Sequence, residues 1–144
     1  MINKLRLFSG LLCLCGYSLQ VQANTDYFCF QAKSSQPILF FSAKNPLESL
    51  TLQYYPYLKP IQLRHFKTES LETTLGRPDE FHDFYYEIMK GIITGHYEVV
   101  HQGAQFYAVT YTQKSTGKQT LFNRLYSDQV NSPLQFAQQG INCI

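Results

Sequence analysis

Apolar and polar residues alternate along much of the chain after residue 26, and no long stretch repeats with the period of a helix. Alternation places neighbouring side chains on opposite faces of an extended chain, which is typical of strands with one buried face. The pattern predicts eight strands, at Tyr27–Ala32, Ile38–Ser42, Leu50–Tyr55, Ile61–Lys67, Phe81–Met89, Ile92–His101, Phe106–Gln113 and Gln119–Tyr126. Short connections favour hairpins, so we expect a mainly β fold, a small antiparallel meander barrel or sandwich. Closure as a barrel would remove the exposed edges of the sheet.

One hairpin is predicted to turn at Lys90-Gly91, where glycine can adopt the positive φ of a two-residue turn. Met89 then faces Ile92, and the register that follows places Gly95 opposite Tyr86. We expect an apolar inner face formed by Phe84, Tyr86, Ile88, Ile93, Gly95, Tyr97 and Val99. We expect a polar outer face formed by Asp83, Tyr85, Glu87, Thr94, His96 and Glu98. This separation of apolar from polar residues supports the register.

A second hairpin is predicted to turn through Lys114–Gly117, with Gly117 in a left-handed conformation. Both of its faces are apolar, so the sequence leaves open which of them is buried. One face carries Phe106, Ala108, Leu121 and Leu125, and the other carries Tyr107, Val109, Tyr111 and Phe122.

One or two short helices are expected to interrupt the sheet. Ser132-Pro133 precedes Leu134–Gln139 and Gly140 follows it, an order typical of helix ends. Thr68–Leu75 is a second candidate, and Asn45-Pro46 would begin a single turn.

The first residues have the three parts of a secretory signal peptide. A basic start with Lys4 and Arg6 precedes the apolar run Leu7–Cys15, and Val21-Gln22-Ala23 gives the small residues of a cleavage site. The run is shorter than the roughly 20 residues that cross a bilayer as a helix. We therefore expect cleavage near Ala23, a periplasmic or secreted protein of one domain over residues 24–144, and no membrane span in the mature chain.

Removal of this leader changes the charge and the cysteine count. Of twelve Lys and Arg residues, Lys4 and Arg6 leave, so that the remaining ten equal the ten Asp and Glu residues. A chain without net positive charge is not expected to bind nucleic acid. Cys29 and Cys143 then remain, and an even pair in an exported protein predicts a disulfide. Two buried free thiols are the alternative.

No nucleophile elbow, dinucleotide fingerprint or P-loop is present in the sequence, and we expect neither enzymatic activity nor a cofactor. The four histidines lack the Cys/His spacing of a zinc site, so no metal is expected. His96 is predicted to face outward, and His82 is predicted to face inward with Phe84.

Two groups of residues are candidates for binding a partner. The first is an acidic, tyrosine-bearing patch on the outer face of the first hairpin, formed by Asp83, Tyr85, Glu87, His96 and Glu98. Asp83 directly opposite Glu98 would be destabilising unless a cation, a basic partner or solvent relieved the repulsion. The second comprises Tyr55 and Tyr57, which would either contact a partner or close one end of a barrel.

The ends of the chain resemble the periplasmic inhibitors of C-type lysozyme. Tyr27-Phe28-Cys29 is similar to their aromatic-x-Cys opening strand, and Cys143 is similar to the C-terminal cysteine that bridges to it. The resemblance implies a small exported β-barrel that binds a lytic enzyme. Those inhibitors act through a Ser/Gly-rich loop, of which the stretch Thr94–Tyr97 keeps only Gly95 and Tyr97, so no inhibitory residue is carried over.

The sequence therefore predicts an exported, non-enzymatic binding or inhibitor protein of the bacterial envelope whose partner is a protein, either a lytic enzyme or a toxin to which the chain confers immunity. The alternative is a small β-barrel that carries a hydrophobic ligand. A third hypothesis is a hydrolase that uses Asp83, Glu87 or Glu98 as acid and base, which would require these carboxylates to converge in a cleft.

Overall fold

The computed structural model describes residues 25–32, 38–42, 50–126, 136 and 138–144. These residues form nine strands: β1 (Thr25–Ala32), β2 (Ile38–Ser42), β3 (Leu52–Tyr54), β4 (Pro60–Leu71), β5 (Glu80–Met89), β6 (Ile92–Gln102), β7 (Gln105–Gln113), β8 (Gln119–Leu125) and β9 (Ile141–Cys143). The first eight correspond to the strands predicted from the alternating pattern, whereas β9 was not predicted.

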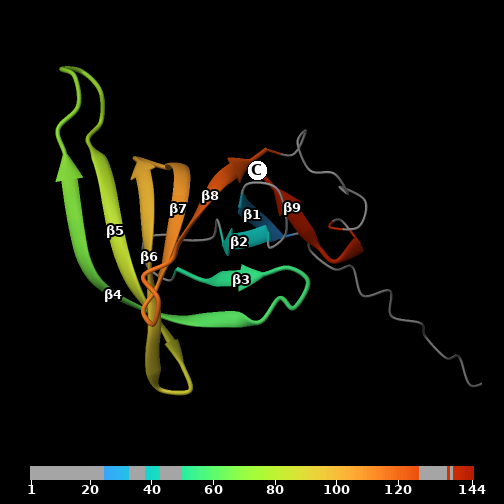
Figure 1. Ribbon diagram of the computed structural model, residues 1–144. Coiled ribbons are helices and arrows are strands. Elements are labelled where there is room, and N and C mark those ends of the chain that lie inside the picture. The colour runs from blue at the N-terminus through green and yellow to red at the C-terminus, as the bar shows by residue number, and fades with distance from the viewer. Residues whose placement is uncertain (1–24, 33–37, 43–49, 127–135, 137) are drawn as a thin grey trace, which may run out of the picture.

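The strands close into an antiparallel barrel (Figure 1). Each of β2 to β8 pairs with its neighbour in sequence, β8 pairs with β1, and β1 pairs with β2 to complete the circle. β9 lies parallel to the first residues of β1, before the part of β1 that pairs with β8. The predicted mainly β fold is therefore confirmed in its barrel form.

The interior of the barrel is packed with side chains. Nine residues with at most 4% exposure form its centre: Phe30, Leu39, Phe41, Leu52, Tyr97, Val99, Phe106, Val109 and Phe122. Several of these rings meet edge to face, as in the 5.1 Å contact between the centroids of Phe41 and Phe106. Burial of each large side chain stabilises the fold by about 1.5–3 kcal/mol.

A disulfide joins the two ends of the barrel chain. The sulfur atoms of Cys29 in β1 and Cys143 in β9 are bonded, as the sequence predicted, and their Cα atoms lie 5.5 Å apart. Ile38, Phe136 and Ile141 form a second buried cluster around the bridge. The disulfide therefore fixes β9 beside β1, where only three residues of each strand pair.

The hairpin of β5 and β6 turns at Lys90-Gly91 as predicted, and both residues have positive φ. The register beyond the turn, however, was wrong. A β-bulge adds one residue to β6, so that Glu87 pairs with Gly95 instead of Thr94. From this point the two faces of β5 are exchanged relative to the prediction, because a shift of one residue reverses the direction of every side chain.

A second bulge answers the question that the sequence left open for β7 and β8. Val100 pairs with Ala108 and His101 with Phe106, which leaves Tyr107 as the extra residue. Phe106 and Val109 can therefore both point into the core although they are three residues apart, and Tyr107 is 40% exposed. The turn contains Gly117 with a φ of 69°, as predicted.

The predicted helix at Thr68–Leu75 was wrong. Thr68–Leu71 extend β4 because they pair with residues of β5, from Thr68 with Asp83 to Leu71 with Glu80. At the C-terminus Phe136 and Gln138 are helical and Gly140 has positive φ, whereas residues 127–135 and 137 and the turn predicted at Asn45-Pro46 lie outside the described residues. Within the described part of the chain, no helix is long and apolar enough to span a membrane.

Candidate functional site

The bulge in β6 divides the acidic patch predicted on the first hairpin. Asp83 and Glu87 are each only 9% exposed and point into the barrel, and Tyr85 lies on the same inner face. His96 and Glu98 point outward, on the opposite face from the buried Tyr97. Asp83 pairs with Val99 across the strands, so the predicted repulsion between Asp83 and Glu98 does not arise.

The Glu87 carboxylate accepts three hydrogen bonds inside the barrel. Thr94 Oγ1 donates to Oε1 over 2.6 Å, Tyr111 donates to Oε1 over 2.8 Å, and Tyr97 donates to Oε2 over 2.7 Å. The Tyr54 hydroxyl lies 3.1 Å from that of Tyr97 and must donate to it, since the Tyr97 proton is used on Glu87. A carboxylate loses its hydrogen bonds to water when it is buried, and these hydroxyl donors replace them.

Burial changes the acidity of these tyrosines. It raises the pKa of Tyr54 to about 12, and it is also the largest cause of the raised pKa values of Tyr97 and Tyr111. Proximity to Glu87 adds to the effect, because a phenolate beside a carboxylate would be repelled. The hydroxyls therefore stay protonated and remain donors.

Gly95 allows Tyr111 to reach this carboxylate. A Cβ atom built on Gly95 would lie 2.6 Å from the Tyr111 hydroxyl oxygen and 2.6 Å from the Thr112 carbonyl oxygen. No side chain fits at that distance, and Tyr111 from β7 fills the space. Tyr86, which was predicted to lie opposite Gly95, pairs with His96. An isolated glycine in a strand is also the signal that could have revealed the bulge.

Asp83 is held in a second polar cluster at the other end of β5. Thr68 Oγ1 donates to Asp83 Oδ1 over 2.5 Å, and His101 Nε2 lies 3.0 Å from Oδ2. His101 Nδ1 donates to the Gly103 carbonyl over 3.0 Å, so both of its ring nitrogens are engaged. The His101 ring is stacked between Phe81 and Phe106, with centroid distances of 5.4 and 5.1 Å.

These contacts determine what the buried acids can do chemically. A general base needs a lone pair that a substrate can reach, and a general acid needs a transferable proton. Glu87 faces hydroxyl donors from its own barrel, and Asp83 faces Thr68 and His101. The two carboxylates belong to separate clusters and do not converge with Glu98 in a cleft, so this arrangement supports a structural role. Among the described residues, no group of His, Cys, Asp and Glu side chains could hold a metal ion.

Three aromatic side chains gather on the outer face of β4 and β5, the exposed Phe66 and the half-buried Phe84 and Tyr86, and we call them the aromatic wall. Phe66 is the extra residue of a bulge in β4, is 40% exposed, and stacks on Tyr86 with a centroid distance of 3.9 Å. Arg64 lies over the Tyr86 ring and Lys67 over the Phe84 ring, at 5.5 and 5.4 Å from the centroids. The wall therefore combines stacked rings with two cations.

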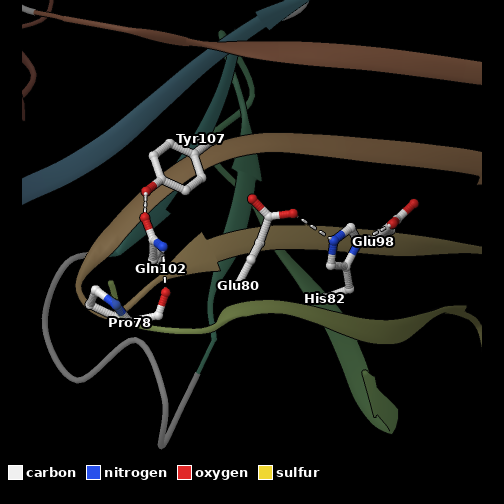
Figure 2. Close-up of polar contacts among 6 residues, drawn as sticks. All are labelled: Pro78, Glu80, His82, Glu98, Gln102 and Tyr107. Carbon is white, nitrogen blue, oxygen red and sulfur yellow. Dashed lines mark hydrogen bonds and ion pairs between the residues drawn. The ribbon is translucent and has the colours of Figure 1, made fainter. Parts of the chain in front are cut away.

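Glu80, His82 and Glu98 lie together on the outer face of β5 and β6 (Figure 2). His82 Nδ1 is 2.7 Å from Glu98 and Nε2 is 3.1 Å from Glu80, so both ring nitrogens donate when His82 is protonated. The hydrogen bond to Glu98 is the largest cause of the raised pKa of His82, and Glu80 adds to it. The prediction that His82 faces inward was wrong because it rested on the bulge-free register.

A shallow groove of about 400 Å³ adjoins the wall on β5, β6 and β7. Its lining consists of Tyr86, Ile93, Gly95, His96, Thr112, Gln113, Lys114 and Gly117. Tyr86 belongs to both the wall and the groove, so the two features form one continuous surface.

Tyr55 and Tyr57 lie on the connection between β3 and β4. The Tyr55 ring is half-buried and packs edge to face against Phe136 at 5.1 Å, in the cluster around the disulfide. Tyr57 is 78% exposed. Tyr55 therefore helps to cover one end of the barrel, and Tyr57 is the member of the pair that is open to contact.

No protein-family model, curated protein or solved structure gives a significant match to this chain.

Proposed function

We propose that the chain is an exported, non-enzymatic binding protein of the bacterial envelope that neutralises a lytic enzyme or toxin by covering it. The observation that carries this proposal is the aromatic wall on the outer face of the sheet, where the exposed Phe66 ring stacks on the half-buried Tyr86 ring. Aromatic and arginine side chains are enriched in protein interfaces because they cover a large area with little loss of conformational freedom. The wall offers both kinds of group on a rigid sheet.

The contents of the barrel support binding at the outer surface instead of inside. Nine buried side chains pack the centre, and the carboxylates of Asp83 and Glu87 already accept hydrogen bonds from neighbouring strands. A carrier of a hydrophobic ligand would need free volume at this place. A filled core therefore favours the binding protein over the carrier.

Substitution of the wall tests the proposal. The mature chain is used to capture its partner from an envelope extract, the partner is purified, and the affinity of each variant for it is measured by calorimetry. Phe66→Ala with Tyr86→Ala is expected to weaken binding by about thirtyfold, the loss typical of an interface hot spot. Leu121→Ala is the matched control, since Leu121 is 51% exposed on β8.

Unchanged affinity of the wall variant, or equal losses in the wall and control variants, would contradict the proposal. A C-type lysozyme is the first defined target to assay, because of the resemblance at the two ends of the chain. Inhibition that depends on Phe66 and Tyr86 would identify the target class, and absence of inhibition would discard lysozyme as the target.

A further inference from the structure

The hairpin of β4 and β5 extends past the turn between β6 and β7 (Figure 1). We call its end, Thr68–Glu80, the distal hairpin. Thr68 to Asp79 are all exposed, and two of them are large and apolar: Leu71 is 53% exposed and Leu75 is wholly exposed at 103%. A leucine that is exposed at the end of a projecting hairpin does not stabilise the fold by the hydrophobic effect, because folding does not remove its side chain from water.

The end of this hairpin is ordered by its own contacts. The Arg77 amide donates to the Thr74 carbonyl over 3.0 Å, which closes a turn around Leu75 and Gly76. Gly76 has a φ of 88°, the value required at the third position of a type II turn, so Leu75 occupies the second position. Thr73 Oγ1 donates to the Pro78 carbonyl over 2.9 Å and ties the two sides of the loop together.

Side chains from neighbouring strands brace the hairpin from the side (Figure 2). Gln102 Nε2 at the end of β6 donates to the Pro78 carbonyl, and the Tyr107 hydroxyl donates to Gln102 Oε1 over 2.8 Å. Next to this brace, the His82 ring on β5 holds the side chains of Glu80 and Glu98 in place. A loop that is already fixed loses less conformational entropy on binding than a flexible one.

The distal hairpin is acidic although the mature chain is expected to be neutral. It contains four acids, Glu69, Glu72, Asp79 and Glu80, and a single base, Arg77, which gives a net charge of −3. Charge concentrated on a projection guides the approach of a partner of opposite sign and disfavours partners of the same sign. An anionic membrane surface is therefore a poor match, and a basic protein surface is a good one.

We propose that the distal hairpin inserts into a basic, concave site of a partner protein, where Leu75 enters an apolar pocket and the surrounding carboxylates pair with Lys or Arg. This inference rests on the proposed function, and it names the part of the surface that makes the protein specific for its partner. The aromatic wall continues from the same strands and contacts the rim of the site. A projecting, braced and acidic hairpin is suited to fill the cleft of a lytic enzyme that binds an anionic polymer.

Photo-crosslinking tests the placement of Leu75. The photoreactive residue p-benzoylphenylalanine replaces Leu75, Phe66 or Leu121 in the full chain, and each protein is irradiated in an envelope extract. We expect one discrete adduct from positions 75 and 66, with the same basic protein, and no such adduct from position 121. Adducts from position 66 alone would overturn the insertion of the hairpin and leave the proposed function standing.

Other patterns of adducts would also be decisive. Absence of adducts from both 66 and 75 would overturn the inference and the proposed function together. An adduct of position 75 with a second copy of this chain, or with an acidic protein, would overturn the basic partner.

Neutralising acidic residues of the distal hairpin tests whether its partner site is basic. The triple variant Glu69→Gln, Glu72→Gln, Asp79→Asn leaves Glu80 on His82 and changes only exposed side chains, and Glu69→Gln also removes the ion pair of Glu69 with Lys67. Against the purified partner we expect about tenfold weaker binding at low salt and a smaller dependence of affinity on salt. Arg77→Gln makes the hairpin more acidic and is expected to strengthen binding. Equal affinity of the triple variant and the unaltered chain at low salt would contradict a basic site.

Discussion

The Tyr97 hydroxyl donates a 2.7 Å hydrogen bond to the Glu87 carboxylate in the interior of the barrel. This pair joins β5 to β6 within a polar cluster that also draws on Tyr54 and Tyr111. A buried carboxylate is tolerated only where donors replace its lost hydration. The cluster therefore explains how an acidic residue can point into an otherwise aromatic core.

Removal of the Tyr97 hydroxyl is expected to destabilise the protein. Tyr97→Phe leaves one carboxylate oxygen of Glu87 without its donor and Tyr54 without its acceptor, which costs about 1.5–3 kcal/mol for a hydrogen bond to a charged group. Urea unfolding of the two proteins measures the difference. The control is Tyr57→Phe, which removes the hydroxyl of a tyrosine that is 78% exposed and should change stability by less than about 0.5 kcal/mol. Equal effects of the two substitutions would rule out the cluster as described.

Alkaline pH is expected to weaken the fold. Burial raises the pKa of Tyr54 and of Tyr85 to about 12, whereas the same residues in the unfolded chain ionise near 10. Because the pKa values are raised in the folded state, the contribution of these two tyrosines to the free energy of unfolding is complete below pH 10. It is lost as the pH rises toward 12. Each such group contributes a slope of up to about 1.4 kcal/mol per pH unit in that window. Phenolate absorbance followed together with urea unfolding tests this; constant stability between pH 10 and 12 would refute it.

His82 is expected to titrate above its ordinary value near 6.5, because Glu98 and Glu80 accept hydrogen bonds from its protonated ring. The contribution of the protonated His82 ring to the free energy of unfolding is fully present below about pH 6.5. It is lost as the pH rises through the raised pKa of His82 in the folded state. An NMR titration of the His82 ring measures this value directly. Glu98→Gln should lower the pKa of His82, and Glu80→Gln should lower it by less. An unaltered titration in the Glu98 variant would mean that the pair does not form.

The close approach at Gly95 gives a further prediction. Gly95→Ala would place a methyl group 2.6 Å from the Tyr111 hydroxyl and the Thr112 carbonyl, so one strand must move. We expect a loss of about 1–3 kcal/mol in the free energy of unfolding, as for other overpacked sites. A variant as stable as the parent would show that β6 and β7 are not in contact at this point.

Loss of the disulfide is expected to destabilise the chain because Cys29 and Cys143 are 114 residues apart. In the chain-entropy model, closing so long a loop in the unfolded state raises the free energy of unfolding by about 4–5 kcal/mol. Cys29→Ser with Cys143→Ser should lower the free energy of unfolding by about 2–5 kcal/mol, measured in urea. Two titratable thiols in the denatured, unreduced protein would contradict the bridge.

The strands could be predicted because alternation is a local property of the sequence. Ile38–Ser42 was predicted with the bounds that β2 has in the structure, and the turn at Lys90-Gly91 follows from glycine and its flanking residues. Ile141–Cys143 could not be predicted, since three residues are too few to show alternation, and their strand depends on pairing with β1 and on the disulfide.

The candidate site depended on register, which is not local. Both faces of β5 carry aromatic residues, so hydrophobicity alone could not show which face is buried. One extra residue in β6 sends Glu87 inward and Tyr86 outward, and only Gly95 marked that position. The acidic character expected of the partner-binding surface reappears on the distal hairpin, where the sequence had suggested a helix.

Amide hydrogen exchange of the chain, alone and bound to its purified partner, tests the central claim most directly. Binding through the outer surface of β4 and β5 predicts protection of Arg64–Tyr86, with the greatest change at the turn around Leu75, and unchanged exchange in β8. Protection confined to β8 and β9, or no protection in β4 and β5, would contradict the account.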